Sequence, residues 1–176
     1  MAMNLIKSYP ELLELAHLDE RDRKQSLMSV FRRDIELNEN FQFRGKKIRP
    51  IKNEDGEPAT QTLFHHLTTC SDESPEGKQT KRRLFEYDRA RRLHWIRVHV
   101  EEQLEGNIII FSYIDRIDGR DKCRTYIYNT DHAYVIILEL QNSGKDYYLI
   151  TAYHLNQKQG RNQIENKLKK KLDYIF

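Results

Sequence analysis

Four short apolar segments, separated by turn sequences, follow one another in the C-terminal half of this 176-residue chain. They are rich in Ile, Val, Tyr and Thr, the residues that β-strands favour. Strands joined by a turn as short as Asp118-Gly119 must pair antiparallel, because parallel neighbours need a long crossover between them. The sequence therefore predicts a roughly four-stranded antiparallel sheet, whose strands are the segments 108–114, 123–128, 133–140 and 147–155.

A helix is predicted immediately before this sheet, over residues 81–105. Its apolar side chains recur at helical spacing and form one stripe, which we expect to pack across a face of the sheet. The stripe consists of Leu93, Ile96, Val100 and Leu104. Gly106 suits the end of this helix. A last, C-terminal helix with apolar residues at Ile164, Leu168 and Leu172 is predicted after the sheet.

The N-terminal part of the chain has a different character. Residues 10–37 are predicted to be helical, whereas 38–61 contain Gly and Pro at several positions and are predicted to form a loop excursion, with a short helix after it. The polar segment 70–80 is a candidate linker. We therefore expect an α+β protein in two parts, with N-terminal helices over 1–78 and an α+β domain over 79–176.

Positive charge is concentrated in two stretches, although the net charge of the chain is only +3. In the first stretch the acidic residues thin out to Glu86 and Asp88. Its basic residues are Lys78, Lys81, Arg82, Arg83, Arg89, Arg91, Arg92 and Arg97. The second stretch consists of Arg161, Lys167, Lys169, Lys170 and Lys171. Such runs are compatible with a nucleic-acid partner, and they are equally compatible with solvated helix faces.

Cysteine usage and the N-terminus bear on the compartment. Cys70 and Cys123 lie far apart and lack the spacing of metal ligands, which favours a reduced, cytoplasmic protein. Residues 1–7 lack the apolar core of a signal peptide, and no stretch has the length and hydrophobicity of a membrane span. The adjacent pair His65-His66 lacks the spacing of a helical metal site, so we expect neither a metal, nor a cofactor, nor a membrane partner.

His94 is the first candidate for chemistry. At about 100° per residue, it lies at the edge of the apolar stripe, on the side of Arg91 and Arg97. A helix packed on a sheet would hold His94 at the rim of a cleft, with two guanidinium groups nearby. An imidazole can serve as general acid or base near neutral pH. The alternative is a boundary histidine whose ring is satisfied by a backbone carbonyl.

Strand alternation selects further candidates on the sheet. Arg124 and Tyr126 share a face of one predicted strand, and Thr151 and Tyr153 share a face of the last one. An arginine can clamp a phosphate with two donors. Hydroxyl groups can donate to the same phosphate, and tyrosine rings can stack on splayed bases. The alternative is an ordinary amphipathic sheet with an exposed tyrosine ladder.

The order of helix, sheet, Leu-Ile-Thr-Ala-Tyr run over 149–153 and basic tail resembles the phage-associated branch of the barnase–EndoU–colicin–RelE nuclease superfamily, over residues 80–172. The resemblance implies N-terminal helices, a four-stranded antiparallel sheet, and cleavage of RNA without a metal by attack of the ribose 2′-hydroxyl on the phosphate. It also implies a histidine from the helical part, an arginine from a strand and a Ser or Thr near the last strand. The matching positions are His94, Arg124 and Thr151, with Tyr126 and Tyr153 as neighbours.

From the resemblance we expect a metal-independent endoribonuclease of phage or mobile-element origin, or a degenerate relative, with RNA as its partner and an antitoxin or immunity protein as a further candidate partner. The expected RNA-binding residues are Arg91, Arg92, Arg97, Lys81, Arg82 and Arg83. Two other interpretations stay open: a non-catalytic RNA-binding or protein-interaction module on the same fold, and a phage accessory factor. The deciding feature is whether His94, Arg124 and Thr151 converge.

Overall fold

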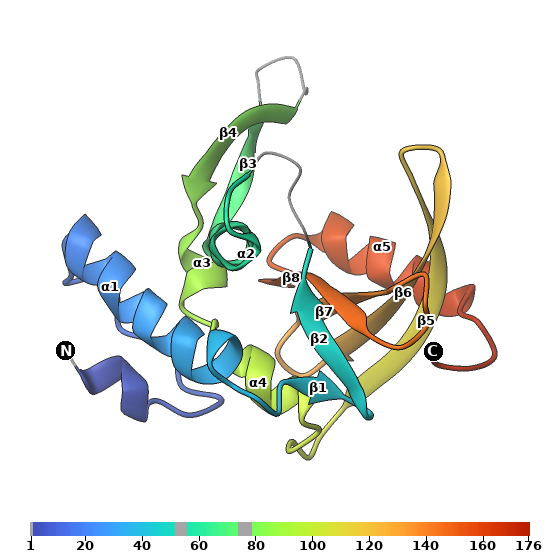
Figure 1. The fold of residues 1–176 in the computed structure, drawn as a ribbon, viewed down its shortest axis with the longest axis horizontal. Helices are drawn as coiled ribbons and strands as arrows, with labels where there is room; N and C mark the ends of the chain where they lie inside the picture. The colour runs from blue at the N-terminus through green and yellow to red at the C-terminus, as the bar shows by residue number, and fades with distance from the viewer. Residues whose placement is uncertain (1, 52–55, 74–78) are drawn as a thin grey trace.

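The computed structural model describes residues 2–51, 56–73 and 79–176, with only the backbone for 2, 72–73 and 79–82. It is an α+β structure built on a curled, mixed sheet (Figure 1). In spatial order the six strands are β1 (Gln42–Phe43), β2 (Lys46–Pro50), β8 (Tyr147–His154), β7 (Tyr134–Leu140), β6 (Arg120–Asn129) and β5 (Ile108–Ile117). A separate hairpin consists of β3 (Thr69–Glu73) and β4 (Gln79–Phe85). The helices are α1 (Glu20–Phe31), α2 (Ala59–Thr68), α3 (Tyr87–Ala90), α4 (Trp95–Val100) and α5 (Lys158–Lys169), with short turns of helix η1 (Ala2–Ile6) and η2 (Arg32–Glu36).

The four predicted strands are present and pair antiparallel in sequence order. Phe111 of β5 lies opposite Tyr126, Tyr126 opposite Ile137, and Ile137 opposite Thr151. A register shift between Ile137 and Leu138 adds an extra residue to β8 at this point. Because of the shift, Leu149 and Ala152 both face the helices. Strict alternation along the strand would instead place Ile150 and Ala152 on that face.

The sheet is larger than four strands, because β2 joins β8 in parallel and β1 pairs with β2. This part of the chain was predicted to be a loop from its Gly and Pro residues. Gly45, with a φ of 81°, makes the tight turn between β1 and β2. Pro50 is the last residue of β2 and lies beyond the residues that β1 pairs with, so its missing N–H costs no bond on that side. Gly45 and Pro50 therefore lie at the two ends of β2 and are compatible with a strand between them.

The helix predicted over 81–105 is wrong in its first part. Residues 79–85 form β4, which pairs with β3, so the described residues of the predicted linker, 70–73 and 79–80, belong to strands. Lys and Arg are good helix formers, but pairing across the hairpin overrides that local preference. Helical structure comes only in the short pieces α3 and α4, and the chain leaves α4 after Val100, with Glu102 at a positive φ of 53°.

The helix predicted over 10–37 likewise begins later, at Glu20. The Asp19 carboxylate caps it by accepting a hydrogen bond from the Asp22 N–H at 2.8 Å. The short helix predicted after the loop excursion is confirmed as α2. Within the described residues, no helix is both long and apolar enough to cross a bilayer.

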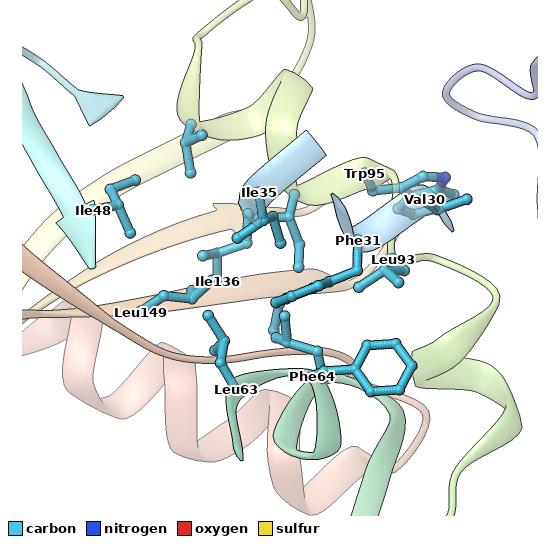
Figure 2. Close-up of a cluster of buried hydrophobic side chains, with 14 of the residues drawn as sticks. Val30, Phe31, Ile35, Ile48, Leu63, Phe64, Leu93, Trp95, Ile136 and Leu149 are labelled. Atoms are coloured by element: carbon cyan, nitrogen blue, oxygen red, sulfur yellow. The ribbon is translucent and has the colours of Figure 1, made fainter. Parts of the chain in front are cut away.

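Two apolar cores lie on opposite faces of the sheet. On one face α1, α2 and the α3–α4 segment pack against residues such as Ile136 and Leu149 (Figure 2). Phe31 and Phe64 belong to this core, so N-terminal residues and sheet residues are buried together. The predicted boundary at residue 78 itself lies outside the described residues. The other core forms where α5 packs on the opposite face, and it consists of Phe111, Tyr126, Tyr128, Ala133, Val135, Ile137, Leu155 and Ile164.

Candidate functional site

The structure does not bring the three predicted catalytic residues together. Arg124 and Thr151 belong to the face of the sheet on which α5 packs. His94 directly precedes α4, and its neighbours Leu93 and Trp95 pack into the core on the opposite face. The prediction placed His94 within a helix, whereas it is the residue before α4 and its ring lies against the N-terminal segment. The predicted set is therefore corrected: these three side chains do not form one site.

His94 is enclosed by backbone. Its Nε2–H donates to the carbonyl oxygen of Glu11 at 3.0 Å, and the indole Nε1–H of Trp95 donates to the same oxygen at 3.0 Å. Because a carbonyl oxygen only accepts, Nε2 carries the proton, and Nδ1 is a buried acceptor without a partner. Burial lowers the pKa of His94 to about 4, so the ring is neutral at neutral pH. This arrangement matches the alternative interpretation, a boundary histidine bound to a backbone carbonyl.

Two guanidinium groups lie beside His94, those of Arg97, as predicted, and of Arg33 in place of the predicted Arg91. Arg97 shares with His94 a pocket of about 310 Å³ that Arg33 also lines, whereas Arg91 does not. The buried carboxylate of Asp34 lies 2.7 Å from Arg33 Nε and 3.7 Å from Arg97 Nη1. The charges around His94 are therefore paired with each other, which leaves this pocket little attraction for an anion.

Arg124 and Tyr126 are likewise held by partners. Arg124 Nε lies 3.1 Å from the Glu139 carboxylate on the adjacent strand. The hydroxyl of Tyr126 donates to Asp115, and Lys167 Nζ of α5 lies 2.6 Å from Asp115 and 3.0 Å from that hydroxyl. Burial, followed by the Asp115 carboxylate, raises the pKa of Tyr126. This buried cluster ties α5 to the sheet and leaves the phenol protonated.

Tyr153 lies where β8 meets α3, and Thr151 lies two residues before it on the same strand. The Arg89 guanidinium is centred 5.5 Å from the ring centre of Tyr153, and the Thr151 hydroxyl is buried without a partner. In the described part of the chain, six buried side-chain polar atoms lack a hydrogen-bond partner. Five of them come from this region, namely from Arg89, Arg91, Arg92, Thr151 and His154. We call these five residues and Tyr153 the α3–β8 junction.

Arg83 and Arg89 form the most distinctive feature next to this junction. Arg83 Nη2 donates to the carbonyl oxygen of Thr69 at 2.8 Å, and Arg89 Nη1 donates to the same oxygen at 2.7 Å. Arg89 Nη1 also donates to the His66 carbonyl oxygen at 2.9 Å. Two guanidinium groups thus meet on one carbonyl oxygen, at the end of α2. We call them the arginine pair.

No carboxylate in the described residues lies within ion-pair distance of the arginine pair. Burial and then the charge of Arg89 lower the pKa of Arg83, and burial lowers that of Arg89. Burial and both arginines also lower the pKa of His66. Guanidinium groups stay charged at neutral pH despite such shifts. The end of α2 therefore carries two positive charges whose natural complement is an anion.

The remaining predicted binding residues are spread over different surroundings. Arg91 stacks on a tyrosine of α3, with its guanidinium 5.2 Å from the ring centre. Arg92 donates to the Asp88 carbonyl oxygen at 2.6 Å and lies 3.5 Å from the Asp88 carboxylate. The side chains of Lys81 and Arg82 lie outside the described part of the structure. The predicted basic run is thus a set of separate contacts instead of one continuous surface.

Sequence reasoning missed the roles of Arg89 and His154. Arg89 was visible as part of the basic run, but its pairing with Arg83 depends on how α3 packs against the end of α2 (Figure 1). His154 is the last residue of β8, and burial followed by the charge of Arg92 lowers its pKa. The sequence does contain a signal for His154, because it directly follows the Thr-Ala-Tyr run at the end of the last predicted strand.

Comparison with protein-family models, curated proteins and solved structures finds no match for this chain. Among the described residues, no group of three or more His, Cys, Asp or Glu side chains is placed to hold a metal ion. The arginine pair and the α3–β8 junction are contiguous, because Arg89 belongs to both.

Proposed function

We propose that the protein binds RNA, and that the arginine pair holds a phosphate of the RNA backbone. The observation that carries the proposal is that Arg83 and Arg89 converge on one carbonyl oxygen without a carboxylate partner among the described residues. Arginine is suited to this role because its planar donors match the oxygens of a phosphate. The single negative charge of a bound backbone phosphate would offset the repulsion between the two guanidinium groups.

The α3–β8 junction supports the same proposal. Arg89 Nε and the Thr151 hydroxyl are buried without partners, and such groups cost about 1–3 kcal/mol each when left unsatisfied. Phosphate and ribose oxygens supply the missing acceptors and donors. The half-buried ring of Tyr153 beside Arg89 offers a surface on which a splayed base can stack. The resemblance over residues 80–172 points to RNA as the nucleic acid.

The binding proposal is tested with a short fluorescently labelled single-stranded RNA in EDTA, using anisotropy. Arg89→Lys keeps the charge but removes the planar fork, and we expect it to weaken binding roughly 10- to 150-fold, the equivalent of one charge-assisted hydrogen bond. Arg124→Lys is the matched control, because Arg124 is already occupied by Glu139. Equal effects of the two variants, or a wild-type protein that binds no RNA, would contradict the proposal and favour a protein-interaction module.

Cleavage of RNA without a metal is a second candidate function, favoured by the position of His154. Its Nδ1 is buried without a partner, and burial, followed by the charge of Arg92, lowers its pKa, so the imidazole is neutral and can accept a proton at neutral pH. In this proposal His154 takes the proton of a ribose 2′-hydroxyl, and the 2′-oxygen bonds to the adjacent phosphorus. The bond between the phosphorus and the 5′-oxygen breaks, and that oxygen takes up a proton from water.

The cleavage proposal is tested by incubating the protein with RNA in EDTA and looking for fragments that end in cyclic phosphate. His154→Ala should lower the rate about 10²–10⁴-fold while RNA binding persists, and His17→Ala, at an exposed position, should leave it unchanged. If His94→Ala abolished cleavage and His154→Ala did not, the catalytic histidine would be His94, as predicted from the sequence. Cleavage of RNA that is methylated at every 2′-hydroxyl would show that the 2′-hydroxyl is not the nucleophile.

A further inference from the structure

A cavity of about 260 Å³ lies between α1, the end of α2 and β4. Its apolar floor is formed by Leu27, Phe64 and Phe85. Its polar rim carries Arg23, Lys24, Arg83, Glu20, His65, Thr68 and Thr69. An apolar floor with a few polar groups at the rim is the usual construction of a small-ligand site. Of the arginine pair, Arg83 lines this cavity and Arg89 does not.

The charge of this cavity is unbalanced. Arg23, Lys24 and Arg83 contribute three cations, against the single carboxylate of Glu20. In the described segments, none of these three cations forms an ion pair. Among the described residues, the hydrogen-bond partners of the Arg83 side chain are neutral oxygens, including the Thr69 hydroxyl at 2.7 Å. The cavity therefore favours a ligand with negative charge at the Arg83 end.

The cavity also offers a flat surface. The guanidinium of Arg23 lies 4.0 Å from the ring centre of Phe85, so the two groups are in stacking contact. Nucleobases stack on both arginine planes and aromatic rings. A ligand that combines a flat aromatic ring with a phosphate fits the apolar floor, the Arg23–Phe85 stack and the unbalanced charge together.

The cavity is continuous with the arginine pair. Arg83 lines the cavity and shares the Thr69 carbonyl oxygen with Arg89. A phosphate on the arginine pair would therefore lie at the mouth of the cavity. A nucleotide attached to that phosphate can enter it without leaving the site.

We propose that this cavity is a base-binding subsite, which takes the base of the nucleotide adjoining the phosphate held by the arginine pair. The proposal rests on the proposed function and deepens it. It assigns a role to α1 and α2, which lie in the N-terminal region outside the segment that resembles the nucleases. The C-terminal region and the arginine pair would then hold the RNA backbone, and the N-terminal helices would bind one base.

The test combines an RNA series, in which a single abasic ribose is moved along a short strand, with two matched variants. In the wild-type protein, the abasic residue should weaken binding about 5- to 150-fold at one position, the loss expected for one stacked base. In Arg23→Ala this position-specific loss should disappear, because the stack is already gone. Arg21→Ala is the control: Arg21 lies on the same helix, is exposed and does not line the cavity.

The outcomes separate the two proposals. RNA binding that depends on Arg89, with the same abasic loss in Arg23→Ala as in Arg21→Ala, would overturn the subsite and leave the proposed function standing. An absence of any position-specific loss in the wild-type protein would overturn it as well. A wild-type protein that binds no RNA would overturn both proposals. Crosslinking of a 4-thiouridine placed at the sensitive position should recover peptides from α1 or α2; crosslinks confined to β5 and β6 would contradict the subsite.

Discussion

The pocket around His94 and the arginine pair are both rich in cations, yet they differ in how these charges are balanced. Beside His94, the Lys7 ammonium lies 2.8 Å from Glu14, and Arg97 lies 3.1 Å from Glu101. At the arginine pair, two guanidinium groups meet on one carbonyl oxygen, and no carboxylate of the described chain pairs with either.

The difference separates charges that stabilise the fold from charges that are available to a ligand. A paired cation offers an incoming phosphate little, because its carboxylate must first be displaced. An unpaired cation that is partly buried has already lost part of its hydration, and an anion restores the lost interaction. Positive charge alone is therefore a poor guide to a binding site, and the absence of a carboxylate partner is a better one.

The largest expected effect is a loss of stability at acid pH, because His94 and its neighbour His99 are buried and neutral. Burial lowers the pKa of each to about 4 in the folded protein, from an ordinary value of 6.5. Protonation therefore favours the unfolded chain. The stabilising contribution is complete above pH 6.5 and is lost as the pH falls toward 4, on the order of 3 kcal/mol for each ring.

Urea unfolding between pH 7 and pH 4 measures this effect. His94→Asn should lose less stability over that range than the wild-type protein, because it has one fewer group to protonate. His17→Asn, at an exposed position, should follow the wild-type curve. An identical pH dependence of all three proteins would mean that His94 is accessible to protons in the fold, as a catalytic histidine would be.

A second prediction concerns the cluster that ties α5 to the sheet. Asp115→Ala removes the carboxylate that accepts from Tyr126 and pairs with Lys167. We expect a loss of about 3 kcal/mol, the low end of the range for breaking a buried ion pair, because the Lys167 side chain is 31% exposed and can turn to solvent. Chemical denaturation checks it. A loss below about 1 kcal/mol, the range of surface pairs, would mean that these charges are not coupled and that Tyr126 is free for another role.

The smallest expected effect is at the paired cations around His94. Arg97→Gln breaks the ion pairs of Arg97 with Glu101 and Asp34. Because the Arg97 side chain is 40% exposed and Asp34 keeps Arg33 as a partner, the stability should fall by at most about 1 kcal/mol. RNA affinity should change little. A large loss of affinity would show that an ion-paired arginine still binds phosphate, which would undo the distinction between the two regions.

Sequence patterns predicted the four consecutive strands because alternation and turns are local properties, and Ile127 and Tyr126 do point to opposite faces. The addition of β2 to β8 could not be read in this way, since Ile48 and Tyr147 are distant in the sequence. The contact of His94 with the N-terminal segment could not be predicted, because that segment contributes a backbone carbonyl, which carries no residue-specific signal.

The arginine pair was hidden for the same reason. Its members were recognisable as part of a basic run, but Thr69, whose carbonyl oxygen they share, gives no sign of this role in the sequence. That neither arginine pairs with a carboxylate of the described residues is a property of the packed structure. The run itself predicted Arg91, Arg92 and Arg97 as equals of Arg83, whereas the structure gives each of them a different neighbour.

The salt dependence of RNA affinity tests the central claim most directly. The logarithm of the association constant for single-stranded RNA falls with the logarithm of salt concentration by about 0.7 for each phosphate that is neutralised. Replacing Arg83 and Arg89 together with Gln should therefore flatten the slope by about 0.7, the contribution of one phosphate. Replacing the ion-paired Arg97 and Arg124 together with Gln should leave the slope unchanged. A slope that flattens equally in both double variants, or only in the second, would contradict the account.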